Sequence, residues 1–241
     1  MGHCNLRNRR CTSVSGENWS WVRFWQRLPR RAALALYSIP RYALEKYYGC
    51  GPFHITPAKY KQYCLDIVAY LNSRPNRGSI IDIGCGFGDV LLKAKFKHRV
   101  GLDHKQCVLD ALRFCARITG RSRTLETRLY KFGEGLPIDG HFDYIVICNW
   151  IHNIAPDVLR DAFEAMFHDN LNPDGELIFD TVSGEHYPYQ HDEKFLSENI
   201  NADVFVIGEY TNGHIIGGGS RRVVSLRKYN PASGIRSSPT K

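Results

Sequence analysis

The feature that most constrains the fold is an apolar run that leads directly into closely spaced glycines. Residues 80–83 are apolar except for Asp82, and glycines then occupy alternate positions from Gly84 to Gly88. Such a run is typical of a strand buried inside a parallel sheet. The glycines that follow indicate a turn at which a ligand comes close to the backbone.

The charge of this glycine loop indicates which kind of ligand it suits. Asp82 and Asp89 flank the glycines, and no lysine lies within the loop. A phosphate-binding loop typically uses lysine and helix N–H groups and has no carboxylate beside them. A dinucleotide fingerprint would also place its third glycine at position 89, where an aspartate would repel a pyrophosphate. The loop therefore favours a ligand with a positive end, such as one that carries an ammonium and a sulfonium group.

The segments around the loop alternate between short apolar strands and amphipathic helices. The expected strands are residues 79–83, 99–103, 127–132, 144–148, 176–180, 203–207 and 221–228. The expected helices of this part are residues 57–71, residues 89–97, a segment through Val108, Leu112 and Cys115, and a segment from Pro156. This alternation predicts a mainly parallel sheet covered on both faces. The glycine-rich link at Gly213–Gly219 predicts a hairpin, and hence one antiparallel strand.

Most of the positive charge lies in the first fifth of the chain. The net charge is +8, and residues 1–48 hold nine of the basic residues against two acidic ones. Trp19–Leu28 carries aromatic and apolar residues on one side and arginines on another, which predicts a short amphipathic helix ended by Pro29. Two further short helices are expected at residues 32–37 and 42–48. We favour the interpretation that this N-terminal extension is a lid over the substrate pocket. The second alternative is an interfacial helix that contacts anionic lipid through residues 19–48, and the third is a nucleic-acid contact.

These observations divide the chain into three parts. Residues 1–48 are expected to form the helical extension, residues 49–229 one α/β domain, and residues 230–241, rich in Ser, Pro and Gly, a disordered tail. No run of about 18 apolar residues is present, so no membrane span is expected. The eight cysteines form no CxxC pair, which favours free thiols, a cytoplasmic location and no bound metal.

A second acidic group follows the second expected strand. Asp103 ends the segment Gly101–Asp103 and comes nineteen residues after Gly84. In open α/β sheets, ligands bind outside the carboxyl ends of the strands. A carboxylate at this place can accept hydrogen bonds from both hydroxyls of a ribose.

Four motifs follow one another in a specific order and spacing. They are Asp82-x-Gly84-x-Gly86-x-Gly88, then Gly101-Leu-Asp103, then residues 142–154 with Asn149-Trp-Ile-His152, then residues 171–180 with Asn-Pro173-Asp-Gly175. Together they resemble class I S-adenosylmethionine-dependent methyltransferases over about residues 50–228. The resemblance implies a Rossmann-like, doubly wound, seven-stranded sheet, mainly parallel with one antiparallel strand, preceded here by the N-terminal helical extension.

The same resemblance implies cofactor-binding roles at ten positions. These are Asp82, Gly84, Cys85, Gly86, Gly88, Asp103, His104, Glu134, Asn149 and Trp150. The glycines would let the backbone approach the methionine part of S-adenosylmethionine, and Asp82 would hold its ammonium. Asp103 would take the ribose hydroxyls, with His104 near the adenine. Asn149 and Trp150 would face the methyl group.

One departure from the family pattern follows the third expected strand. The family often has an acid and a small apolar residue after the third strand, which read the adenine amino group. Residues 132–137 are offset from that pattern. Glu134 is therefore the candidate for the adenine contact.

His152 is the candidate catalytic residue, just beyond the fourth strand. A base is needed only if the acceptor must lose a proton during attack. His152 could supply that base or hydrogen-bond the substrate, and the alternative is a structural histidine on the turn. Residues 184–192 hold tyrosines and histidines and suit either an acceptor-binding loop or a solvent-facing segment.

The expected function is methyl transfer from S-adenosylmethionine to a small-molecule or glycan-like acceptor, at oxygen. An RNA methyltransferase and a catalytically inactive scaffold with the same fold are the alternatives. No Asn-Pro-Pro-Tyr motif occurs, and the positive charge is confined to the N-terminus, so nucleic acid is not the favoured partner. The intact acids and glycines argue against the scaffold. Peripheral contact with the inner membrane surface remains an alternative for the location.

Overall fold

The computed structural model describes residues 30–51, 54–185, 187–197, 200, 202–211 and 219–228. The chain divides into two compact units, Met1–Tyr37 and Ser38–Lys241, and the second unit contains the whole sheet. The predicted helix at Trp19–Leu28 and the predicted tail at 230–241 lie outside the described residues. The lid and lipid alternatives therefore stay predictions.

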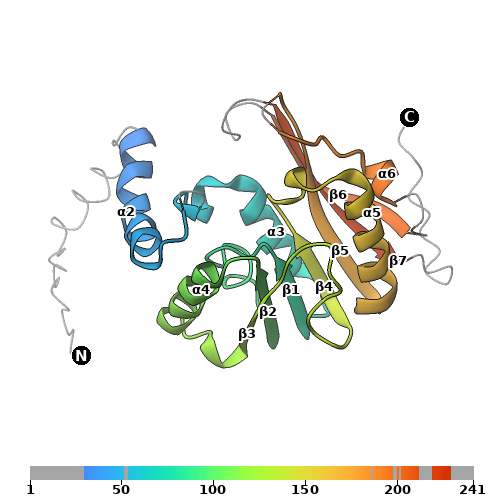
Figure 1. The fold of residues 1–241 in the computed structure, drawn as a ribbon, viewed down its shortest axis with the longest axis horizontal. Helices are drawn as coiled ribbons and strands as arrows, with labels where there is room; N and C mark the ends of the chain where they lie inside the picture. The colour runs from blue at the N-terminus through green and yellow to red at the C-terminus, as the bar shows by residue number, and fades with distance from the viewer. Residues whose placement is uncertain are drawn as a thin grey trace, which may run out of the picture. The chain divides into compact units, whose positions relative to one another are not determined.

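One sheet of seven strands forms the centre of the second unit. Its strands are β1 Ser79–Ile83, β2 His98–Asp103, β3 Leu125–Leu129, β4 Phe142–Ile147, β5 Leu171–Ser183, β6 Ala202–Thr211 and β7 Ser220–Lys228. They follow the order β3-β2-β1-β4-β5-β7-β6 (Figure 1). Only β7 runs antiparallel to its neighbours, β5 and β6. The predicted fold class is confirmed.

The strand order reverses between β1 and β4, which is where such sheets bind ligands. In the registers, Asp82 pairs with Gly101 of β2 and with Val146 of β4. The carboxyl ends of β1, β2 and β4 therefore lie at one edge of the sheet. The loops that follow these three strands meet there.

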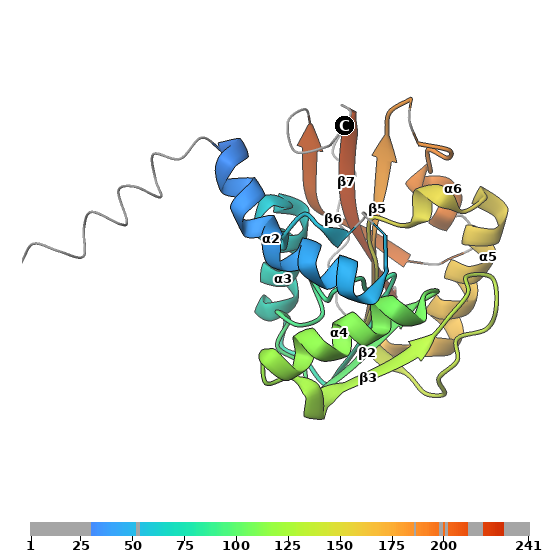
Figure 2. The ribbon, with the colours of Figure 1, turned by 60° about the vertical axis from the view of Figure 1, so that its left-hand side comes forward.

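Helices cover both faces of the sheet. The helices of the described residues are α2 Arg30–Tyr48, α3 Gln62–Ser73, α4 Gln106–Ile118, α5 Pro156–Ala165 and α6 Glu193–Ser197, and the shorter turns are the 3-10 turns η2 Ala58–Tyr60, η3 Ser122–Thr124 and η4 Ile151–Asn153 and the π-turn η5 Met166–Asn170. Figure 1 shows α3 and α4 on one side of the sheet and α5 and α6 on the other. Figure 2 shows α4 running beside β2 and β3, with which it is in contact. None of the described helices is long and apolar enough to cross a membrane.

Alternation along β4 explains why residues 144–147 are all apolar. Tyr144 and Val146 pack in the cluster that contains α3 and α4, and Ile145 and Ile147 pack in the cluster that contains α5. Successive side chains of a strand point to opposite faces, so a strand covered on both sides needs apolar residues at every position.

Two helix predictions were wrong. The expected short helices at 32–37 and 42–48 form the single helix α2, which continues through Pro40. The expected helix at residues 89–97 is an irregular series of turns. Here Arg99 donates from Nε to the Leu91 carbonyl (3.1 Å) and from Nη2 to the Ala94 carbonyl (2.8 Å). Because a side chain satisfies these carbonyls, helical hydrogen bonds are not needed for them.

Candidate functional site

A cavity of about 490 Å³ lies at the carboxyl ends of β1, β2 and β4. The cavity-lining residues that the sequence predicted are Asp82, Gly84, Cys85, Gly86, Asp103, His104, Asn149, Trp150 and His152. The other lining residues are Arg41, His54, Lys61, Tyr63, Cys64, Phe87, Asp89, Val90, Lys105, Cys148 and Asn153. Two predicted residues, Gly88 and Glu134, do not line it.

The glycine turn that follows β1 forms one wall of the cavity. Gly84 and Gly86 adopt φ angles of 72° and 52°, in the left-handed region that favours glycine. A Cβ on Gly84 would lie 3.2 Å from the Trp150 ring, and one on Gly86 would lie 3.0 Å from Nδ1 of His54. A Cβ at either position would require the side chain of Trp150 or His54 to shift by a few tenths of an ångström. A ligand in the cavity can therefore approach the main chain directly.

Gly88 serves packing instead of lining the cavity. Its φ angle is +80°, and a Cβ would lie 2.6 Å from Cγ of Leu92 and 2.7 Å from Cδ1 of Leu112. We expect Gly88→Ala to lower the free energy of unfolding by about 2–4 kcal/mol, because it adds overpacking to left-handed strain. Gly120→Ala is the matched control: its φ angle is +69° but nothing lies within 4 Å of a Cβ. Urea unfolding that gave equal losses for both variants would contradict this packing role.

Asp82 is a buried acid in the floor of the cavity. Its exposed fraction is 5%, and burial raises its pKa to about 8, with Asp89 and Asp103 adding repulsion. A carboxyl group in this state is poorly accommodated as an anion until a positive charge comes close. The site is therefore matched to a cation.

Asp103, at the end of β2, is the second buried acid. Its Oδ1 accepts a hydrogen bond from the Lys105 backbone N (3.1 Å) and lies 3.3 Å from Nδ1 of His104. Burial raises its pKa, and backbone hydrogen bonds and His104 offset part of that rise. The pKa of Asp82 is sensitive to Asp103, which places both acids within electrostatic reach in one cavity.

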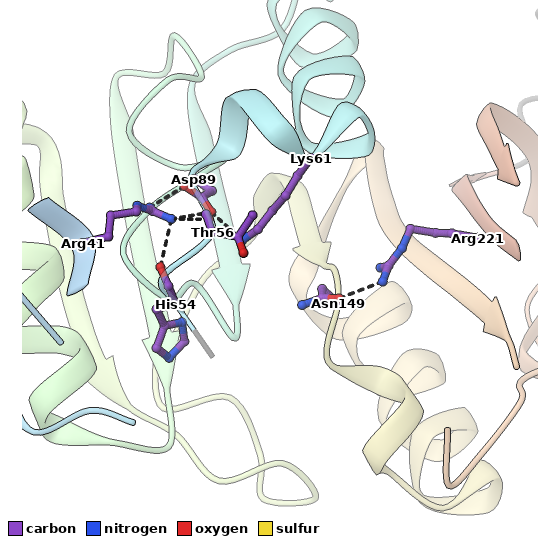
Figure 3. Close-up of polar contacts among 7 residues, drawn as sticks. All are labelled: Arg41, His54, Thr56, Lys61, Asp89, Asn149 and Arg221. Carbon is purple, nitrogen blue, oxygen red and sulfur yellow. Dashed lines mark hydrogen bonds and ion pairs between the residues drawn. The ribbon is translucent and has the colours of Figure 1, made fainter. Parts of the chain in front are cut away.

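The third acid of the cavity, Asp89, is neutralised by basic side chains (Figure 3). Arg41 approaches its Oδ1 to 2.5 Å and Lys61 approaches its Oδ2 to 2.9 Å. Burial favours a higher pKa for Asp89, but Lys61 and Arg41 hold it below its usual range. The helix expected at residues 89–97 does not follow Asp89, and the basic partners of its carboxylate come from the part of the chain before β1.

His54 lies against the glycine turn, with its ring centre 4.9 Å from that of Phe87. Arg41 Nη1 donates to the carbonyls of His54 (3.2 Å) and Thr56 (2.9 Å), which ties this segment to Asp89 (Figure 3). Burial, Lys61 and Arg41 lower the pKa of His54 to about 4. Its imidazole is therefore neutral at physiological pH and can hydrogen-bond a ligand without adding charge.

Asn149, at the end of β4, is held in an unusual backbone conformation. It is the one non-glycine residue in the described part of the chain with a positive φ, at 60°. Its backbone N donates to Oδ1 of Asp180 (2.6 Å), and its Oδ1 accepts from Nη2 of Arg221 (2.8 Å; Figure 3). Asp180 and Arg221 also form a buried ion pair with each other. This pair fixes the wall formed by Asn149 and Trp150.

Glu134 does not reach the cavity, so the candidate adenine contact is corrected. Its side chain is exposed, and its carbonyl accepts a hydrogen bond from the Tyr130 hydroxyl (3.1 Å). β3 ends at Leu129, three residues earlier than predicted. Phe132, in the same segment, packs beside the cavity wall, with its ring centre 5.6 Å from that of Trp150.

His152 lies in η4 and is half-buried at the cavity. Its ring centre is 4.7 Å from that of Tyr187, and its carbonyl accepts a hydrogen bond from the Tyr189 backbone N (3.2 Å). His191 Nε2 lies 2.8 Å from the Ile151 carbonyl. The loop after β5 therefore packs against η4, beside the cavity, as an acceptor-binding loop would.

Sequence reasoning missed the cavity residues that precede β1, above all Arg41, His54 and Lys61. No motif marks them, because they come from α2 and the segment after it, and Arg41 and Lys61 reach Asp89 only through the fold. The one sequence feature that pointed toward them was Asp89 in the glycine loop, because a buried acid needs a basic partner. In the part of the chain that the structure describes, no group of three or more His, Cys, Asp or Glu residues could hold a metal ion.

Comparisons with known sequences give one informative relative. No family model matches the chain. An uncharacterized methyltransferase from Staphylococcus carnosus (strain TM300) is 29% identical over 115 residues, which are 48% of this chain and 52% of the relative. The match thus spans about half of the length of the curated relative.

Comparisons with solved structures agree with this sequence match. The methyltransferase domain of bacterial CtHen1-CN aligns with a TM-score of 0.54 at 18% identity, over 69% of this chain and 98% of that one. The YcgJ protein of Bacillus subtilis aligns with a TM-score of 0.56 at 10% identity, over 70% and 100%. Geranyl diphosphate methyltransferase in complex with SAM aligns with a TM-score of 0.54 at 12% identity, over 70% and 85%. The resemblance to class I methyltransferases is confirmed, and the chain has their fold.

Proposed function

We propose that the chain is an S-adenosylmethionine-dependent methyltransferase that acts on a small-molecule or glycan-like acceptor, at oxygen. The observation that carries this proposal is the pair of buried acids, Asp82 and Asp103, in one cavity with a glycine turn that has no lysine. Among the described residues, neither carboxylate forms an ion pair with a lysine or arginine, which disfavours a pyrophosphate and suits a cationic nucleoside. The methyltransferase neighbours support the same conclusion.

The lining residues divide into groups that match the parts of this cofactor. Asp82 pairs with the ammonium beside the open backbone of Gly84 and Gly86. The positive side chains that hold Asp89 lie at the same wall and suit the carboxylate of the amino-acid part. Asp103 accepts hydrogen bonds from the ribose hydroxyls, and His104 lies next to it. When bound, S-adenosylmethionine supplies a methyl group on a positively charged sulfur.

The chain then has to position the acceptor and take up its proton. In-line attack needs the acceptor oxygen held close to the methyl carbon, so most of the rate gain comes from orientation. The rigid wall at Asn149 and Trp150 fixes the geometry of that approach. His152 lies beyond this wall and takes the hydroxyl proton as the oxygen–carbon bond forms and the carbon–sulfur bond breaks.

Cofactor affinity should depend on pH through Asp82. A raised pKa of about 8 means that the ligand-free site is mostly protonated below that pH, whereas a cationic ammonium favours the ionised form. The apparent dissociation constant should therefore increase as the pH falls below about 8, by up to about tenfold per pH unit. Isothermal titration at several pH values checks this. Asp82→Asn should bind weakly with no such slope, and a slope that persisted in this variant would assign the effect to another group.

The activity itself is tested by transfer of a tritiated methyl group to fractions of an extract of the source cell. We expect label in a small-molecule or glycan fraction, and a loss of about a hundredfold or more in rate for His152→Ala. Cofactor affinity of this variant should be unchanged. Label in RNA would favour the RNA methyltransferase. Cofactor binding with no labelled fraction would favour the scaffold.

A further inference from the structure

A second groove, of about 740 Å³, lies at the opposite edge of the sheet from the cofactor cavity. It is formed where the chain enters β1, β2 and β4, at their amino ends. Its lining residues are Pro75, Asn76, Arg77, Gly78, Lys95, Phe96, Lys97, Arg99, Arg121 and Asp143. None of the predicted site residues belongs to it.

The groove is strongly basic, because the one acid among its lining residues, Asp143, already accepts hydrogen bonds from neighbouring groups. Oδ2 of Asp143 accepts hydrogen bonds from the backbone N of Gly78 (2.9 Å) and Ser79 (2.8 Å), and Oδ1 accepts from Nδ2 of Asn172 (2.8 Å). The basic lining residues are Arg77, Lys95, Lys97, Arg99 and Arg121. Among the described residues, no acid forms an ion pair with any of them.

Arg99 makes this arrangement unusual, since its exposed fraction is only 1%. Its guanidinium donates to the carbonyls of Leu91 and Ala94 and to Oγ1 of Thr124 (2.6 Å), all of which are neutral acceptors. Burial lowers its pKa, and Arg121 lowers it further. A buried charge without a counter-charge is costly. An anion in the groove would relieve that cost.

The backbone presents these charges in a fixed arrangement. The N–H of Lys97 donates to the Arg77 carbonyl (3.3 Å), and the N–H of His98 donates to the Gly78 carbonyl (2.8 Å). The N–H of Lys95 donates to Oδ1 of Asn72 (2.8 Å). The two loops that carry Arg77, Lys95 and Lys97 are thus joined to each other, and little ordering is needed when a ligand binds.

We propose that this groove binds phosphate groups, at least two of them on one ligand. Guanidinium and ammonium groups are the side chains that bind phosphate in proteins, and several of them converge here around an open groove. The phosphates could come from a small polyphosphate or from a single-stranded RNA backbone. The proposal does not depend on the methyltransferase function, because no residue is shared with the cofactor cavity.

Isothermal titration of the full chain tests this proposal with two probes, inorganic tripolyphosphate and a single-stranded RNA of about twelve nucleotides. The test variant is Lys95→Gln/Lys97→Gln/Arg121→Gln. The matched control is Lys93→Gln/Arg117→Gln/Arg123→Gln, which removes the same charge from exposed residues outside the groove. We expect the groove variant to lose about tenfold or more in affinity and the control less than about twofold.

The outcomes separate the sources and can overturn the proposal. Groove-dependent binding of tripolyphosphate assigns a small polyphosphate, and groove-dependent binding of RNA alone, weakening steeply with salt, assigns a nucleic-acid backbone. If neither probe binds, the proposal is overturned. An equal loss of affinity in the control variant overturns it too. S-adenosylmethionine affinity, measured in the same proteins, should be unchanged in the groove variant, so a failure here is distinct from a failure of the methyltransferase proposal.

Discussion

Asp103→Ala is expected to weaken S-adenosylmethionine binding by about a hundredfold. The carboxylate would accept charge-assisted hydrogen bonds from both ribose hydroxyls, each contributing about 1.5–3 kcal/mol, and alanine removes both. Isothermal titration against the unchanged protein measures the loss. Asp103→Asn should bind with intermediate affinity, because an amide oxygen still accepts a hydrogen bond but carries no charge.

The thermal stability of the Asp103→Ala variant separates a binding role of Asp103 from a structural one. Burial raises the pKa of Asp103, which means that its ionised form is disfavoured in the folded protein. Removing the carboxylate should therefore leave the midpoint of thermal unfolding close to that of the unchanged protein, or raise it. Asp110→Ala on α4 is the control, since Asp110 lies outside the cavity and pairs with Arg113 at 2.8 Å. Equal affinity losses in both variants would refute the ribose role.

Arg221→Ala should lower the free energy of unfolding by about 3–5 kcal/mol, because it leaves Asp180 as a buried charge with no partner. The exposed fractions of the two side chains are 4% for Arg221 and 1% for Asp180. The Arg221 guanidinium also lies 4.3 Å from the ring centre of Tyr63, a residue that lines the cavity. Urea unfolding gives the loss directly.

The neighbouring residue Arg222 offers a matched control. It pairs with Glu193 at 2.9 Å and Glu209 at 3.0 Å, but its side chain is exposed. Exposed ion pairs contribute about 0–1 kcal/mol, so Arg222→Ala should cost little. The double variant Asp180→Leu/Arg221→Met should recover part of the stability, because it removes both charges together. If Arg221→Ala and Arg222→Ala lost the same stability, the pair would not have the structural role we assign to it.

Arg221→Ala should also affect the cofactor cavity. Asn149 would lose the partner of its Oδ1 while keeping its strained φ of 60°, so the wall beside Trp150 would become less ordered. Arg221 thus acts on the cavity through Asn149 and is a positioning residue. In the label-transfer assay, we expect a loss in rate in Arg221→Ala protein that is still folded under the assay conditions.

Much of the fold could be predicted because local patterns decide it. Residues 79–83 are strand β1 within the predicted bounds, and the glycines end it where the sequence indicated. The antiparallel position of β7 followed from the glycine-rich link before it. The prediction of a helix at residues 89–97 was wrong because Arg99, in β2, donates to the carbonyls of Leu91 and Ala94. These residues are close in sequence, but only the folded chain directs the Arg99 side chain toward the two carbonyls.

The site was predictable where one short motif supplies several residues, and not where partners come from distant segments. The motif residues Asp82, Gly84 and Gly86 all line the cavity. Arg41 and Lys61 reach Asp89 from 48 and 28 residues away. Asp180 and Arg221 fix Asn149 across neighbouring strands. Such contacts depend on tertiary structure, and a single sequence gives no signal for them.

The most direct measurement is a calorimetric comparison of S-adenosylmethionine with the dinucleotide NAD, titrated into the full chain under identical conditions. Because of the acids in the cofactor cavity, we expect S-adenosylmethionine to bind with a dissociation constant in the micromolar range and NAD to show no detectable binding. Binding of NAD in preference to S-adenosylmethionine would contradict the selection of a cationic nucleoside by Asp82 and Asp103.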